Sequence, residues 1–447
     1  MASIVIADNV EAQLQRTIAL ALDRARSAGA DQAEVMASQD VGLSVGARMR
    51  DIETIESQND RGFGISVYCG QCKGSASTSD LSTEAVTAAV DKAVYIASQT
   101  GADEYAGLAD PELMATQFPD LELDHAWQLD IDAIKATALE CEAAALDADP
   151  KVSNSEGASV STHRSLSVYG NSHGFMGSER RSRHSLSCAV IAGEGEHMER
   201  DYFYASARNP TALASAAEVG AEAARRAVQR LAPRKITTRQ APVVFRYDQA
   251  AGLIAQLLSA VSGGAQYRKA SYLLDAIGKP VLAPALSLQE RPHMQQGPAS
   301  AAFDAEGVAT KARDIVSDGV LNGYILSSYS ARRLGLQTTA NAGGVHNILL
   351  TPGAQDLPAL LRQMDEGLLV TEMMGQGVNL VTGDYSRGAA GFWVSGGEIA
   401  YPVSEITVAA NLSDMLQNIA GVANDADPHS RIQAGSLLVP SVTIAGS

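Results

Sequence analysis

The sequence predicts an α+β protein with an N-terminal region of helices and antiparallel sheet, a small middle domain, and a mostly β C-terminal domain with a curved antiparallel sheet. Strand-like segments follow one another along the chain, and helical segments stand in separate blocks, which favours α+β over a doubly wound α/β sheet. A chain of 447 residues is long enough for two or three domains. Residues 101–124 are rich in Pro, Gly and acidic residues and indicate a linker. We therefore expect domains at 1–115, 116–233 and 234–447.

The first domain is predicted to combine amphipathic helices with a sheet. Apolar residues at helical spacing predict a helix over 9–28. Ser82 is a typical N-cap residue and predicts a second helix that runs to Gln99. Asn-Asp at 59–60 and Gly-Gln at 70–71 are typical of turns. The strands predicted around these turns are 41–47, 52–57, 62–68 and 73–78.

The middle domain is predicted to repeat this combination. A helix over 126–147 presents apolar residues on one face, beginning with Ile131. An alanine-rich helix over 211–231 ends before Pro233, which cannot continue it. The strands predicted between the two helices are 160–169, 175–190 and 197–207.

The C-terminal domain is predicted to be mostly strands and loops with short helices. Asp248 is expected to cap a helix over 249–262, which the Gly pair at 263–264 ends. The Gly-Gly pair at 396–397 lies between two alternating segments and predicts a hairpin. The other elements predicted here are a strand at 241–247, hairpin strands at 379–394 and 398–409, and short helices from Asp356 and over 413–420.

Composition separates this chain from nucleic-acid-binding, membrane and secreted proteins. Acidic residues outnumber basic ones by 51 to 34, whereas nucleic-acid binders carry basic patches that neutralise phosphate. No apolar stretch reaches the roughly 18 residues of a membrane helix. The N-terminus lacks a signal peptide, and the four cysteines form no secreted-type framework. We expect a cytoplasmic protein that contacts neither nucleic acid nor membrane directly.

Compact catalytic motifs are absent from the sequence. A helical zinc-peptidase site needs two histidines one turn apart and a neighbouring glutamate. None of the eight histidines precedes a glutamate, and no two lie three to five residues apart. No dinucleotide fingerprint follows a predicted strand, and no phosphate-binding loop is present. We expect no catalytic residue and no metal ligand in this chain, and a zinc site assembled from distant residues is the alternative.

Two short motifs are interpreted as turns. Gly-Asn-Ser-His-Gly at 170–174 matches the G-x-S-x-G nucleophile pattern, but strand-like residues follow it where a hydrolase has a helix. Cys69 and Cys72 form a C-x-x-C between two predicted strands, whereas the redox motif opens a helix. A serine hydrolase and a redox site are the alternatives.

Long segments of the chain carry a more specific signal than these short motifs. The segments are 61–82, 171–178, 197–204, 262–281, 327–347 and 381–412. On these segments the chain resembles the PmbA (TldE) side of the TldD/PmbA metallopeptidase family, whose members were historically called modulators of DNA gyrase. The resemblance spans nearly the whole chain.

The resemblance implies a division of labour between two paralogous subunits. The TldD-type subunit holds zinc with an H-E-x-x-x-H helix and a later cysteine, and the PmbA-type subunit lacks these ligands and pairs with it as a heterodimer. Such complexes degrade unfolded or extended peptides, trim a microcin precursor and remove an antitoxin. The metal helix should correspond to the helix near Asp248, where this chain has no histidine, and 421–447 contains no cysteine. The resemblance therefore implies a zinc-less partner subunit without a cofactor of its own.

Glycine-rich polar loops are the candidate peptide-facing surface. Glycine leaves the backbone open to a close approach by an extended peptide, which could add to a sheet edge. The alternative is that the glycines mark bends or bulges and that the loop histidine is structural. The candidate residues are Asn341, Gly343, Gly344, His346 and Asn347 in one loop, and Gly383 and Asp384 in another.

Two other functions stay open at this point. The chain could be an independent hydrolase with a dispersed site, or a regulatory protein-binding factor that acts on DNA gyrase through a protein contact. An obligate partner surface should leave an exposed apolar patch, through which isolated chains can pair as a two-fold homodimer.

Overall fold

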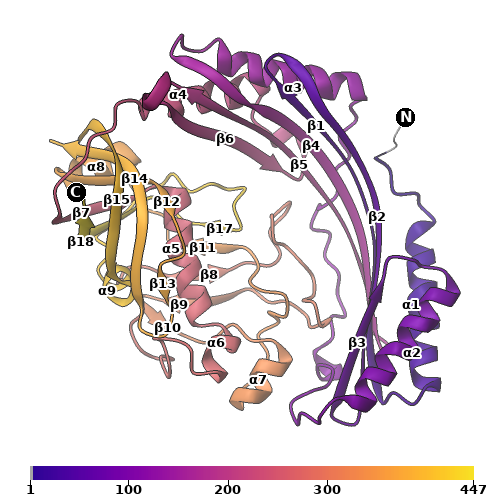
Figure 1. Cartoon of the computed structure of the whole chain (residues 1–447). Helices are drawn as coiled ribbons and strands as arrows, with labels where there is room; N and C mark the ends of the chain where they lie inside the picture. The colour runs from indigo at the N-terminus through magenta and orange to yellow at the C-terminus, as the bar shows by residue number, and fades with distance from the viewer. Residues whose placement is uncertain (1–3, 447) are drawn as a thin grey trace.

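The computed structural model describes residues 4–446, and its N-terminal half is built around one large curved sheet (Figure 1). The strand order is β3-β2-β1-β4-β5-β6, and every neighbouring pair is antiparallel. Strands of the first two predicted domains thus belong to the same sheet, and the boundary between these domains stays a prediction. The strands are β1 (Gln32–Arg48), β2 (Asp51–Cys69), β3 (Cys72–Thr78), β4 (Val152–Asn171), β5 (Met176–Ala192) and β6 (Glu199–Ala207).

Helices cover only the convex face of this sheet (Figure 1). Alternate residues of β1 point toward them, with Val35 buried near α1 and α2 and Val45 buried near α3 and α4. Side chains of a strand alternate between the two faces, so the residues between them face the concave side. The helices are α1 (Val10–Ser27), α2 (Thr83–Gln99), α3 (Ile131–Leu146) and α4 (Ala216–Gln229).

The concave face is rich in small hydroxyl side chains. Ser44, Ser161, Ser185 and Ser206 are register partners across four neighbouring strands. The hydroxyl oxygens of Ser161 and Ser185 lie 2.6 Å apart. Such a row cannot form an apolar core, so the concave face is suited to water or to a polar ligand.

The C-terminal half contains two further sheets and packs inside the curve (Figure 1). In one of them β12 pairs with both β7 and β14, which closes β12, β7, β18, β15 and β14 into a ring. The predicted α+β class with a curved C-terminal sheet is therefore confirmed. The strands are β7 (Arg239–Phe245), β8 (Leu288–Glu290), β9 (Arg313–Ser317), β10 (Val320–Leu321), β11 (Ile348–Leu350), β12 (Gly367–Met374), β13 (Val378–Asn379), β14 (Asp384–Ser395), β15 (Glu398–Asn411), β16 (Gly421–Val422), β17 (Ile432–Gln433) and β18 (Leu437–Ala445).

The helices of this half are short except for α5, which packs against the ring with Leu253, Ile254 and Leu257 fully buried. No helix of residues 4–446 is long and apolar enough to cross a membrane. The helices are α5 (Tyr247–Ala260), α6 (Gly263–Tyr267), α7 (Ser328–Leu334), α8 (Leu357–Met364) and α9 (Leu412–Gln417).

The predicted linker at 101–124 is docked on the C-terminal half. The Tyr329 hydroxyl donates to Asp103 Oδ2 at 2.7 Å. Arg332 donates to the carbonyls of Tyr105, Gly107 and Leu108. The predicted linker is thus held against the C-terminal half, because α7 presents arginines to the carbonyls that an irregular segment leaves free.

Two local predictions in the N-terminal half were wrong. The strands expected at 52–57 and 62–68 are one strand, because Asn59 and Asp60 pair with Val41 and Asp40 in the middle of the β1–β2 ladder. Helix α3 begins at Ile131 instead of 126, because the Asp130 side chain caps it, and Ile131 itself is exposed.

Asp248 is not the cap of α5, which begins one residue earlier at Tyr247. The Arg246 guanidinium binds the Asp248 carboxylate at 2.9 and 2.6 Å. The Gly263-Gly264 pair begins α6 instead of ending α5, because the Ser262 side chain caps a new helix there. By contrast, the predicted cap Ser82, the helix start at Asp356 and the turn at 396–397 are confirmed.

Two glycines inside helices should respond in opposite directions to alanine. A Cβ on Gly220 of α4 would lie 2.1 Å from the Cys141 carbonyl oxygen of α3, so Gly220→Ala should destabilise the protein by about 1–3 kcal/mol. A Cβ on Gly252 of α5 would have no atom within 4 Å, so Gly252→Ala should stabilise the protein by up to about 1 kcal/mol. Thermal unfolding of both variants beside the parent measures this. A Gly220→Ala variant as stable as the parent would contradict the close α3–α4 contact.

Candidate functional site

A cavity of about 1490 Å³ lies between the concave face of the large sheet and the C-terminal half. Drug-sized ligands occupy pockets of about 300–1,000 Å³, so this cavity suits a longer, chain-like ligand. From the sheet it is lined mainly by β5 and β6. From the C-terminal half it is lined by the start of α5 and by loops within 296–305, 342–346 and 425–431.

Arginines attach the sheet to the C-terminal loops at one end of this cavity. Arg208 donates to the carbonyls of Ser182, Gly297 and Pro298 at 2.7 to 3.0 Å. Burial lowers the pKa of Arg208 to about 10, which leaves the guanidinium charged at neutral pH. Arg181 donates to Ser300 O at 3.2 Å. These hydrogen bonds from charged donors fix the spacing of the two walls.

The predicted loop at 341–347 lies at this end, and part of it faces the cavity. Gly343, Gly344 and His346 line the wall, whereas Asn341 and Asn347 are buried and are not among the lining residues. The two ring nitrogens of His346 lie 3.3 and 3.0 Å from the backbone carbonyl oxygens of residues 299 and 340. A neutral imidazole donates from one ring nitrogen only, so it binds one of these two carbonyls at a time.

A buried carboxylate sets the shape of this loop. Glu290 accepts a hydrogen bond from Arg313 Nε at 2.8 Å, and its side chain is 2% exposed. The same carboxylate accepts from Asn341 Nδ2 at 2.8 Å and from the His346 backbone N–H at 2.9 Å. Asn341 also accepts from Arg313 Nη2 at 2.9 Å. Glu290 and Arg313 thus bind Asn341 and His346, which lie near the two ends of the loop, on the side away from the cavity.

The other predicted loop lies elsewhere. Gly383 and Asp384 are at the β13–β14 turn and are not among the cavity-lining residues. Gly383 has a φ of +82° and packs beside Asn411 and Tyr272. The nearby Gly391 lies at a register shift between β14 and β15, where a Cβ would be 1.9 Å from Leu369 O. The bulge interpretation therefore fits Gly391.

Asp304 organises the loop at the base of the cavity. Its carboxylate accepts the backbone N–H groups of Glu306, Val308 and Ala342 at 2.9 to 3.0 Å. Burial, together with the Glu306 charge, raises the pKa of Asp304 to about 7 in spite of these donors.

Aromatic residues at the other end of the cavity were missed by the sequence analysis. Tyr202 and Tyr204 extend from β6, with ring centroids 6.4 Å apart and an interplanar angle of 14°. They are 47% and 53% exposed, and Tyr247 of α5 lines the same cavity. The two-residue spacing on a strand was the signal that could have placed both rings on one face.

The two short motifs are turns, as interpreted. Residues 170–174 connect β4 to β5. Cys69 and Cys72 flank the β2–β3 turn, and both are free thiols. Burial and the charge of Asp31 raise the pKa of Cys69, which makes its thiol less reactive.

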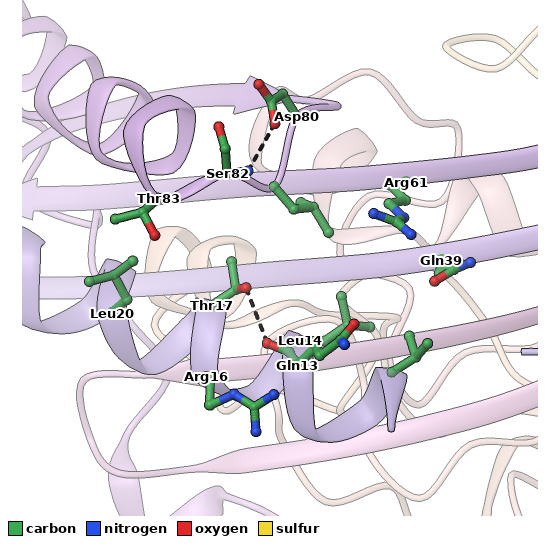
Figure 2. A pocket seen from close by; sticks show the side chains of 12 residues that line it. Gln13, Leu14, Arg16, Thr17, Leu20, Gln39, Arg61, Asp80, Ser82 and Thr83 are labelled. Atoms are coloured by element: carbon green, nitrogen blue, oxygen red, sulfur yellow. Dashed lines mark hydrogen bonds between the residues drawn. The ribbon is translucent and has the colours of Figure 1, made fainter. Parts of the chain in front are cut away.

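A second, smaller groove of about 400 Å³ lies at the far end of the large sheet, between α1, β1, β2 and the start of α2 (Figure 2). Gln13, Arg16 and Arg61 on its rim are exposed. Within 4–446, no group of three or more His, Cys, Asp or Glu residues is placed to hold a metal ion, here or in the larger cavity.

Sequence comparison assigns the chain to a family. Family models described as PmbA/TldA metallopeptidase domain 1, central domain and C-terminal domain match residues 33–97, 124–231 and 238–446. The chain belongs to the PmbA/TldD metallopeptidase family.

Particular relatives match over nearly their full length. The chain is 50% identical to the metalloprotease PmbA homologue of Haemophilus influenzae over 98% of this chain and 97% of that one. It is 47% identical to metalloprotease PmbA of Escherichia coli O157:H7 over 99% and 98%. A TldD homologue of Haemophilus influenzae is 22% identical over 178 residues, which is 37% of each chain.

Solved structures share the whole fold. A proposed modulator of DNA gyrase from Bacteroides thetaiotaomicron superposes with a TM-score of 0.93 at 27% identity, covering 99% of this chain and 100% of the other. TldE from Thermococcus kodakarensis superposes with a TM-score of 0.83 at 18% identity over 97% and 100%, a likeness of fold alone.

Removal of the buried carboxylate behind the loop should be strongly destabilising. Glu290→Ala leaves the part-buried Arg313 without its carboxylate partner and the Asn341 and His346 donors without an acceptor, and should cost about 3–5 kcal/mol. Asp314→Ala breaks the half-exposed pair with Arg291 and should cost less than about 1 kcal/mol. Chemical denaturation of both variants measures the difference. Equal effects would mean that the Glu290 network does not hold the loop.

Asp304 should make stability depend on pH. Its pKa is raised from 3.8 to about 7 on folding, so its stabilising contribution is complete below pH 3.8 and is lost as the pH rises through 7. Between pH 5 and pH 8 the free energy of unfolding of the parent should fall by roughly 2–3 kcal/mol relative to that of Asp304→Asn, whose side chain does not titrate. Denaturation midpoints at both pH values test this, and parallel pH profiles would contradict the raised pKa.

Proposed function

We propose that this chain is the zinc-less partner subunit of a TldD/TldE-type metallopeptidase, and that its cavity holds part of an extended peptide. The position of α5 carries this proposal. The resemblance places the metal helix of a TldD-type chain at α5, and Asp248 and Gln249 from its first turn line the cavity. In a complex of the two subunits, α5 of this chain and the metal helix of the TldD-type subunit can then face one shared cavity. The TldD-type subunit supplies the zinc there.

The side chains at the start of α5 do not fit a zinc site. Arg246 binds both carboxylate oxygens of Asp248, at 2.9 and 2.6 Å. Gln249 donates to Thr371 O at 3.2 Å. A zinc ion needs deprotonated ligands that are free to converge on it, whereas these two groups are held by the protein itself.

The wall of the cavity suits a peptide backbone. Gly344 lines the cavity, and no atom lies within 4 Å of the position that a Cβ would take there. A ligand can therefore approach the main chain at Gly344. β6 is the edge strand of the large sheet and also lines the cavity, so an extended peptide can add to a free sheet edge. We place the complex in the cytoplasm as a heterodimer, and the isolated chain can form a homodimer through the same surface.

The test is cleavage of an unfolded peptide by this chain alone, by its TldD-type paralogue alone, and by the mixture, with bound zinc measured in each sample. We expect this chain alone to be inactive and free of zinc, and the mixture to be active and sensitive to a chelator. Addition of zinc after the chelator should restore cleavage and serves as the control.

Stoichiometric zinc in this chain alone, or chelator-sensitive cleavage by it, would overturn the proposal in favour of a dispersed metal site. A pull-down that retains DNA gyrase without the paralogue would instead favour the regulatory alternative.

A further inference from the structure

The aromatic residues of β6 form a platform that faces the cavity. Tyr202 and Tyr204 lie on the concave side of the sheet, and each exposes about half of its surface, at 47% and 53%. The Arg200 guanidinium already lies 5.5 Å from the Tyr202 ring centroid. Cations are attracted to the faces of such rings within about 6 Å. The platform therefore has the geometry that accepts a positively charged group.

Carboxylates also lie close to this platform. Burial raises the pKa of the Tyr204 hydroxyl, and the carboxylates of Asp427 and Asp248 raise it further. Asp427 is half-buried at the edge of the cavity, and its side chain accepts a hydrogen bond from the His429 backbone N–H at 2.8 Å. The described residues supply it with no ion-pair partner. A carboxylate without an ion-pair partner inside the fold can pair with a cationic guest.

Three arginines near the platform have partners within the fold. Arg226 binds Glu222 at 2.8 Å and lies over the Phe203 ring on the other face of β6. Arg183 donates to Ser206 Oγ at 3.0 Å. Arg200 binds Glu156 at 2.6 Å. None of these three arginines pairs with Asp427, so its carboxylate is available to a ligand.

We propose that Tyr202, Tyr204 and Asp427 form a subsite for a lysine or arginine side chain of the bound peptide. This inference rests on the proposed peptide-binding function and names the substrate class of that cavity. The aromatic faces receive the aliphatic stem and the cation, and Asp427 pairs with the charge.

The test uses three unstructured ten-residue peptides of Gly, Ser and Ala with a fluorescent label and one central Lys, Gln or Phe. Their binding to the complex of this chain with its paralogue is measured by anisotropy in the presence of a chelator, which stops cleavage. The Lys peptide should bind about tenfold more tightly than the Gln peptide at low salt, and less so at high salt. Tyr204→Ala and Asp427→Asn should each remove most of this preference.

Two further variants keep the test interpretable. Tyr204→Phe retains the ring and should retain the preference, and Tyr95→Ala, which removes a 61% exposed ring on α2, should leave it unchanged.

Equal binding of the Lys and Gln peptides would overturn the subsite while peptide binding itself stands. Tighter binding of the Phe peptide would mean an apolar subsite and would also overturn it. If no peptide binds and the mixture cleaves none, both proposals fail.

Discussion

The alternation of side chains along the six strands of the large sheet is the constraint on which the rest of the structure depends. The buried apolar residues of β1 lie at alternate positions, so helices α1 to α4 can cover them on one face. The other face is left with residues such as Ser161 and Ser185, which cannot form a core with a second layer. Because one face is committed to helices and the other stays polar, the C-terminal half meets the sheet through limited contacts, and a cavity is left between them.

Those limited contacts are of two kinds. An apolar cluster that includes Tyr169, Phe175 and Phe303 joins the β4–β5 turn to the C-terminal half. Arginines make the other contacts, with Arg208 and Arg332 donating to backbone carbonyls across the two halves. Charged donors to carbonyls are directional and stronger than neutral hydrogen bonds, so they can fix a distance without filling the space between the walls. This combination explains how a large cavity persists in a chain that also has extensive cores.

Local sequence signals predicted many of the helices and strands correctly. Where such a prediction failed, tertiary contacts often explain why. Ser82 caps its helix and a helix starts at Asp356, both as predicted, because capping involves only residues within three positions. Asn59 is a turn residue by type, yet the β1–β2 ladder holds it in a strand. The same limit applies to the candidate site. Glycine content singled out both Gly344 and Gly383, but only the fold shows that the first lines the cavity and the second does not. The tyrosines of β6 were missed because alternating aromatic residues on a strand are also typical of a core.

Helix α5 lies at the cavity, where the resemblance implies the metal helix of a TldD-type chain, but the side chains of its first turn are not arranged to bind a metal. Arg246 precedes the helix and binds Asp248, and this pair places a carboxylate in the first turn, where it also offsets the positive end of the helix dipole. A ligand set for a metal would need the opposite arrangement, with donor groups left free of internal partners until the metal binds. The start of α5 is therefore built as part of the cavity wall. Its contribution to the proposed complex is shape and negative charge, and this is the same charge that acts on Tyr204 at the aromatic end of the cavity.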